Sequence, residues 1–155
     1  MNIVSYNCSH NAAVCYLKDG KIEWMIEEER VSRKKHDHRP YVSLVDTVRK
    51  VDDIEIALYT TLHHSDDPEL SDRVFNFTCE LIQKVKDKPK LMDCSDEHHL
   101  HHASLGFYNS GFEEAAVLVV DGAGAYVEGG GHEVETIYKA SYPHTFDKVH
   151  QRAVP

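Results

Sequence analysis

The chain has 155 residues and a formal net charge of −9 at pH 7, with 17 lysines and arginines against 26 aspartates and glutamates. Its hydrophobic fraction of 41% and charged fraction of 28% are ordinary for a folded protein, which excludes wholesale disorder. The acidic balance argues against nucleic acid, and no apolar run approaches the roughly 20 residues that span a bilayer, so we expect one cytoplasmic domain over residues 1–155 without a membrane partner.

The N-terminal part of the chain predicts an antiparallel meander of three strands. Strands are expected at 2–8, 11–17 and 22–28. Asp19-Gly20 is the strongest hairpin signal in the chain, because this pair accepts the positive φ angles of a tight turn. The first turn of the meander would then present Ser9, His10 and Asn11 at one end of the sheet.

A strongly charged segment follows the third expected strand. Residues 27–37 (EEERVSRKKHD) change from acidic to basic within a short stretch. One interpretation is a solvated loop with alternating charge. The other is a basic loop near a phosphate or an acidic substrate.

The rest of the chain alternates between expected helices and strands. Apolar residues recur at helical spacing at 40–50 and 69–88, and a third helix is expected at 97–108, where Asn109-Ser110-Gly111 ends it. Strands are expected at 54–59, 91–93, 115–120, 133–140 and 146–151, and a polar loop at 60–68. The uninterrupted apolar run AAVLVV at 115–120 is typical of a central strand.

The helix expected at 97–108 carries a cluster of histidines in a chain that has 12 of them. His98 and His102 are four residues apart and share a helix face, where two imidazoles can bind one divalent metal if a third ligand joins them. Asp121 and His10 are the candidates for that ligand. A solvated histidine-rich helix end is the alternative, because about one such pair is expected by chance at this histidine content. The neighbouring His99 and His101 point elsewhere on the helix, which predicts surface or supporting roles for them.

A glycine-rich turn, Asp121-Gly122-Ala123-Gly124, ends the apolar strand. A strand that delivers a carboxylate into such a turn can hold a metal or a nucleotide phosphate, since glycines let a ligand approach the backbone. An ordinary hairpin turn is the alternative interpretation.

Several segments, taken together and in order, resemble signatures of the O-carbamoyltransferase family, which includes the NodU nodulation proteins and the cephem and tobramycin carbamoyltransferases. The segments are residues 9–13, 27–37, 97–103 and 112–124. Asn11 stands where that family usually has Asp. The resemblance implies an α/β fold of the actin-like ATPase (ribonuclease H-like) class, with a mixed sheet that starts in an antiparallel three-stranded meander and is flanked by helices.

The resemblance also implies a reaction and a set of site residues. A carbamoyl group would pass from carbamoyl-adenylate, made from carbamoyl phosphate and ATP, to a hydroxyl of a small-molecule acceptor, assisted by a divalent metal such as iron. His98, His102 and Asp121 would hold the metal. His10 and Asp121 would be catalytic, with His10 as the base. The expected cofactor-binding residues are Ser9, Asn11, Gly122 and Gly124.

Members of that family are several times longer than this chain and contain a YrdC-like domain that forms the adenylate. We therefore expect an N-terminal fragment that is inactive alone, lacks the YrdC-like domain and has the rest of the enzyme as its partner. Two alternatives come from other classes of protein. One is a non-catalytic actin-like module that binds a nucleotide or a partner, and the other is a histidine-rich metal-storage or metal-sensing domain.

Overall fold

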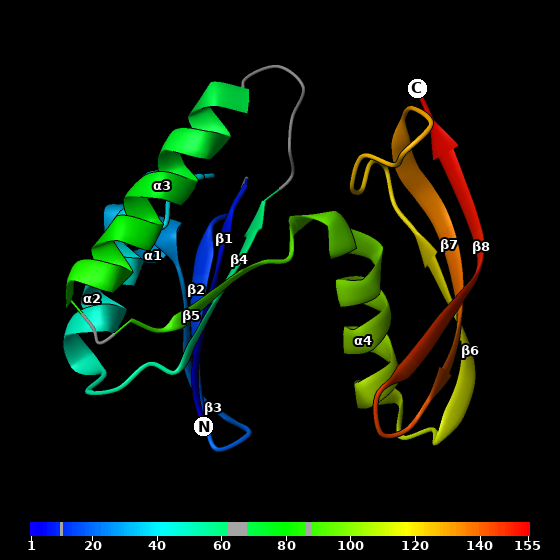
Figure 1. Ribbon diagram of the computed structural model, residues 1–155, viewed down its shortest axis with the longest axis horizontal. Helices are drawn as coiled ribbons and strands as arrows, with labels where there is room; N and C mark the ends of the chain where they lie inside the picture. The colour runs from blue at the N-terminus through cyan, green and yellow to red at the C-terminus, as the bar shows by residue number, and fades with distance from the viewer. Residues whose placement is uncertain (10, 62–67, 86–87) are drawn as a thin grey trace. The chain divides into compact units, whose positions relative to one another are not determined.

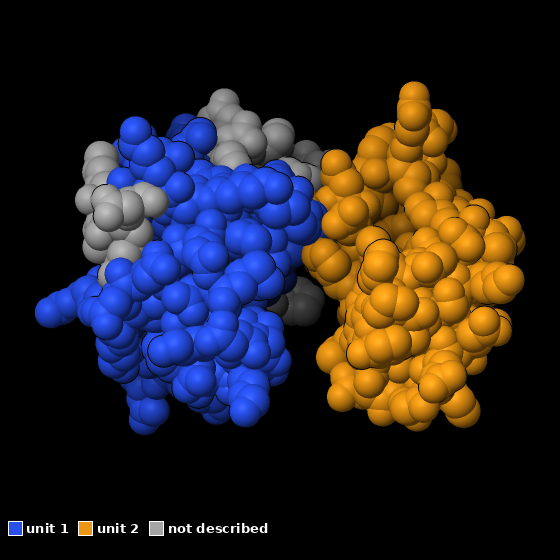
Figure 2. Space-filling model, turned by 60° about the horizontal axis from the view of Figure 1, so that its bottom comes forward, with its two compact units in different colours: residues 1–94 blue, residues 95–155 orange. Residues whose placement is uncertain are grey.

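The computed structural model describes residues 1–9, 11–61, 68–85 and 88–155. The chain divides into two compact units, residues 1–94 and 95–155 (Figure 2). Whether the two units make one domain, as the length suggests, stays a prediction. None of the described helices is long and apolar enough to cross a membrane.

The first unit contains a five-stranded mixed sheet in the order β3-β2-β1-β4-β5. Strands β1 to β3 form the predicted antiparallel meander, and β4 and β5 extend it in parallel from β1. The strands are β1 (Asn2–Cys8), β2 (Ala13–Lys18), β3 (Lys21–Glu27), β4 (Ile56–Thr61) and β5 (Lys90–Asp93). The helices are α1 (Glu28–Ser32), α2 (Tyr41–Lys50) and α3 (Pro68–Val85), of which α2 and α3 lie on one side of the sheet (Figure 1).

The core of the first unit follows from the two-residue period of its strands. Alternate residues such as Val4 and Tyr6 of β1 point to the side that α2 covers, and there they meet Leu44 and Val48. Full burial of an aliphatic side chain such as Val4 or Leu44 contributes about 1.5–3 kcal/mol. Most of the polar loop expected at 60–68 lies outside the described residues.

The charged segment at 27–37 does not begin as a loop. Residues 28–32 form α1, and the Glu28 side chain turns inward, where it is 1% exposed. Its carboxylate accepts hydrogen bonds from the amides of Val42 and Ser43, both at 2.9 Å, and from the Ser43 hydroxyl. The first-turn amides of a helix have no partner within the helix, so Glu28 supplies the acceptor that α2 needs.

The second unit is one helix on a three-stranded antiparallel sheet in the order β6-β7-β8. A short 3-10 turn, η1 (Ser95–Glu97), leads into helix α4 (His98–Ser110). The strands are β6 (Glu114–Val120), β7 (His132–Ser141) and β8 (Thr145–Val154). Helix α4 lies along one face of this sheet (Figure 1), with Ala103 packed against Val119 and Tyr138.

The strand that was expected to be central lies at an edge. Within the described residues β6 pairs only with β7, so the prediction from the run AAVLVV is wrong on this point. Val119 is buried toward α4, whereas Leu118 and Val120 are 62% and 68% exposed. An apolar run indicates strand structure, but it does not say how many faces and neighbours the fold supplies.

Replacement of Glu28 by alanine is expected to lower the free energy of unfolding by about 2–3 kcal/mol, because the buried Ser43 amide loses its acceptor. Urea unfolding followed by circular dichroism measures the loss. Glu23→Ala, at an exposed position of β3, is the control and should change the free energy by less than about 0.5 kcal/mol. Equal stability of the two variants would contradict the capping role of Glu28.

Candidate metal centre

Three side chains with metal-ligating atoms meet where α4 begins and β6 ends. Nε2 of His98 lies 2.8 Å from Oδ2 of Asp121, and Nε2 of His102 lies 3.1 Å from Nε2 of His98. The ligand atoms of His98, His102 and Asp121 all lie within 4.8 Å of one another. The structure thus brings together the three residues that the sequence indicated as metal ligands, and they could hold one ion.

The donor set fits a divalent transition metal. Two imidazole nitrogens and one carboxylate oxygen suit zinc or iron, and three protein ligands leave further coordination positions open. Partial burial pushes the pKa of Asp121 upward, but hydrogen bonds from His98 and the Gly122 amide, together with electrostatic attraction to His98 and His102, lower it, so the net direction is downward. Asp121 is therefore a carboxylate at neutral pH, as a metal ligand must be.

The Asp121 turn packs closely against the start of α4. A Cβ atom added at Gly124 would lie 2.6 Å from Cγ of Glu133 and 2.9 Å from Cδ2 of His99, so only glycine fits there. Gly122 has nothing within 4 Å of the same position. Gly124 therefore has a packing role, while Gly122 leaves the backbone open to a ligand. Cofactor binding by these two glycines stays a prediction.

Of the surface and supporting roles predicted for His99, the structure excludes the surface one. Its side chain is fully buried between α4 and the sheet, and its Nδ1 atom lies 2.7 Å from Oγ1 of Thr136. Burial lowers the pKa of His99, although the neighbouring Glu133 carboxylate opposes the shift. Four of the five residues at 98–102 are histidines, and no signal in the sequence distinguishes the buried His99 from the other three.

The residues predicted in the first loop belong to the first unit. Ser9 Oγ accepts a hydrogen bond from Nδ2 of Asn7 at 3.2 Å, and Oδ1 of Asn11 lies 3.1 Å from Nδ1 of His36. Asn11 has a φ of 66°, a left-handed conformation that asparagine tolerates well. His10 lies outside the described residues. The catalytic roles of His10 and Asp121 and the cofactor-binding roles of Ser9 and Asn11 stay predictions.

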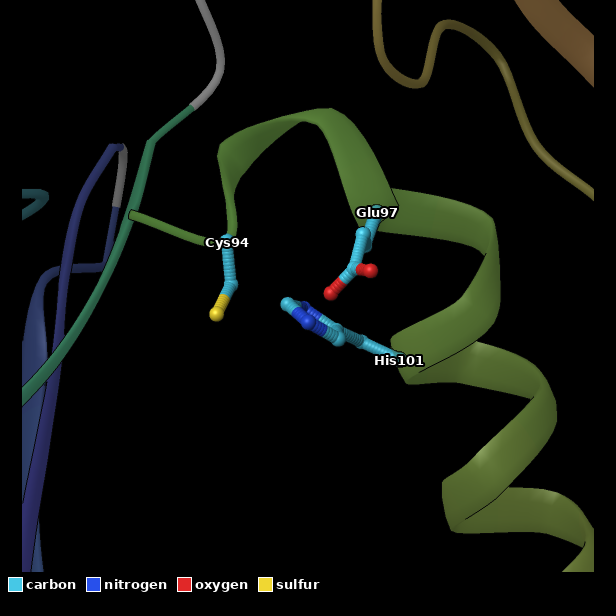
Figure 3. Close-up of side chains that lie close together, drawn as sticks. All are labelled: Cys94, Glu97 and His101. Carbon is cyan, nitrogen blue, oxygen red and sulfur yellow. The ribbon is translucent and has the colours of Figure 1, made fainter. Parts of the chain in front are cut away.

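A second pair of possible ligands stands at the start of α4. Glu97 and His101 are four residues apart, and their side chains point toward one another (Figure 3). Cys94, drawn with them, is the last residue of the first unit, whereas Glu97 and His101 belong to the second.

Comparison with known proteins supports the fold. No protein-family model matches the chain. YeaZ from Pseudomonas aeruginosa superposes with a TM-score of 0.55 at 14% identity, covering 100% of this chain and 69% of YeaZ. An uncharacterized protein with similarity to peptidase YEAZ from the same organism gives 0.57 at 14% identity, covering 99% of this chain and 66% of that one. The chain therefore has the predicted actin-like, ribonuclease H-like ATPase fold.

One curated relative is the uncharacterized protein sll1178 of Synechocystis sp. (strain ATCC 27184 / PCC 6803 / Kazusa). It is 28% identical over an alignment of 176 positions, gaps included, that covers 88% of this chain. The chain spans only 28% of that protein's length.

The comparisons overturn the expected membership of the O-carbamoyltransferase family. The two solved structures are YeaZ and a YeaZ-like protein, and neither is a carbamoyltransferase of the NodU type. The predicted transfer from carbamoyl-adenylate, made with carbamoyl phosphate, to a small-molecule hydroxyl is therefore wrong. The matched segments are short, and one fold hosts many activities, so motif order on a shared fold does not define a reaction. Whether the chain works with a further domain stays a prediction.

Replacement of Gly124 by alanine is expected to cost about 1–3 kcal/mol of unfolding free energy, because the new methyl group overlaps buried atoms of Glu133 and His99. The same substitution at Gly122 meets open space and is the matched control. Chemical denaturation of both variants gives the two values. A Gly124→Ala variant as stable as Gly122→Ala would show that the turn does not pack as described.

Proposed function

We propose that this chain is an actin-like binding module that holds one divalent metal ion through His98, His102 and Asp121 and uses it to receive the phosphates of a nucleotide. The observation that carries the proposal is the convergence of two imidazole nitrogens and one carboxylate oxygen within 4.8 Å. Two of these residues come from α4 and the third follows β6, so the fold itself brings them together.

Charge explains why a nucleotide would need the metal. The chain carries a net charge of −9, and Asp121 is a carboxylate at the centre of the site. A phosphate would be repelled there unless a divalent cation stood between the two anions. The ion's open coordination positions would accept phosphate oxygens, and Gly122 leaves the adjoining backbone accessible.

Iron is our first expectation for the metal. A set of two histidines and one carboxylate with open positions is typical of non-haem Fe(II) sites, and zinc accepts the same ligands. ATP is our first expectation for the nucleotide, because the fold is of the actin-like ATPase class. In this role the chain binds the metal and the nucleotide and transfers no chemical group.

Calorimetric titration of the full chain with Zn²⁺, and with Fe²⁺ under anaerobic conditions, is expected to give one tight site. His98→Ala, His102→Ala and Asp121→Asn should each weaken binding at least tenfold, because each removes one of three ligands. His144→Ala, exposed in the turn after β7, is the matched control and should bind as the wild type does. Several equivalent ions per chain would instead support a histidine-rich storage domain.

Binding of ATP is expected only after the metal is loaded, since the phosphates would contact the ion. Titration of ATP into the metal-loaded chain, the metal-free chain and metal-treated Asp121→Asn tests this dependence. AMP, with a single phosphate, should bind more weakly than ATP. Equal ATP affinity with and without metal would refute the phosphate role, and metal binding without ATP binding would favour a partner-binding module.

A further inference from the structure

Glu133 is a charged residue at the centre of the second unit. It is the second residue of β7 and only 3% exposed. Its Oε1 atom accepts hydrogen bonds from the backbone amides of His99 at 3.0 Å and Ala125 at 3.3 Å, and its Oε2 atom accepts one from Nε2 of Gln151 at 2.8 Å. One carboxylate thus joins the first turn of α4, the turn after Asp121 and strand β8.

The backbone of Glu133 holds the same turn as its side chain. The Gly124 amide donates to the Glu133 carbonyl at 2.8 Å, and the Glu133 amide donates to the Ala125 carbonyl at 2.9 Å. Together with the close packing at Gly124, these bonds fix the chain three to four residues after Asp121. These contacts therefore fix the position of Asp121, the residue that follows β6, relative to Glu133.

A β-bulge turns Glu133 inward. The pairing of β7 with β8 passes from Glu133 opposite Ala153 to Glu135 opposite Arg152, so Val134 is an extra residue in β7. Such a bulge re-aims the side chains beside it. Glu135 is consequently 32% exposed and pairs with His150 and Arg152, whereas Glu133 is buried.

Burial of the Glu133 carboxylate is unfavourable in free energy, and an apolar side chain of similar size could fill the same space. A carboxylate loses several kcal/mol of hydration free energy when it is buried, and hydrogen bonds or a cation must compensate for this loss. No lysine or arginine pairs with Glu133 in the part of the chain that the structure describes, so its three N–H donors and the positive end of α4 compensate for it.

The atoms that Glu133 holds are next to the metal ligands. His99, whose amide it binds, follows His98 directly, and the His99 ring is fixed inward against Thr136. Successive residues of an α-helix are rotated by about 100° around its axis. When His99 faces the sheet, His98 and His102 therefore face Asp121. We propose that Glu133 is the positioning residue of the metal centre, because it sets the separation between the histidines of α4 and the Asp121 carboxylate.

This inference rests on the proposed function, since it requires that the centre bind a metal. Titration of the full chain with Co²⁺ tests it, because the visible absorption of cobalt reports ligand number and geometry as well as affinity. Glu133→Ala is expected to weaken Co²⁺ binding 10- to 100-fold and to change the spectrum. Glu133→Gln keeps the shape and part of the hydrogen bonding, so it should restore affinity in part.

Glu135→Gln is the matched control, because it changes the same residue type on the same strand at a surface ion pair. It should leave both the affinity and the spectrum unchanged. Circular dichroism and thermal unfolding of the metal-free variants identify those that are folded. A role confined to stability would lower the melting temperature but leave the Co²⁺ spectrum and affinity of folded protein as in the wild type.

The outcomes separate the two proposals. No Co²⁺ binding by the wild type would refute the proposed function itself. Wild-type binding together with an unaltered spectrum and affinity in folded Glu133→Gln and Glu133→Ala would overturn the positioning role alone. If neither variant folds, Glu133→Asp decides, because it keeps the carboxylate but shortens the side chain that reaches the amides of His99 and Ala125. An unaltered spectrum and affinity in that variant would also overturn the positioning role.

Discussion

The free amides at the start of a helix need acceptors, and in both units a buried glutamate supplies one. Glu28 binds the amides of Val42 and Ser43 in the first turn of α2, and Glu133 binds that of His99 in the first turn of α4. Each glutamate lies outside the helix that it binds, 14 residues from Val42 in the first unit and 34 residues from His99 in the second. The carboxylate therefore fixes where the helix begins relative to its sheet, and apolar packing then completes the unit.

Much of the fold follows from local pattern. The Asp19-Gly20 turn and the flanking strand residues predict the meander, helical spacing predicts α2 and α3, and the stop signal at Asn109-Ser110-Gly111 marks the end of α4. The buried glutamates could not be predicted, because a charged residue in a strand or helix pattern indicates a solvent-facing position and their partners are distant backbone amides. The edge position of β6 was missed for a related reason, since strand order depends on pairing partners far along the chain.

The ligand set of the candidate centre could be read from two short patterns, and the structure adds what supports it. Four-residue spacing places His98 and His102 on one helix face, and a strand ending in Asp121 supplies the third group. Neither pattern reveals that His99 is turned inward or that Gly124 leaves room for two buried side chains. The family inference failed because similar short segments can sit on one fold in proteins with different activities.

The exposed side of β6 has a consequence for the behaviour of the chain in solution. In the described part of the second unit, one edge of β6 offers unpaired backbone groups, and Leu118 and Val120 are exposed on the face of the sheet opposite to Val119. An uncharged run of high β propensity at a sheet edge is a template for strand addition and aggregation. Glu113 and Glu114 precede this run and Asp121 follows it, so charged side chains flank it at both ends, which opposes strand addition.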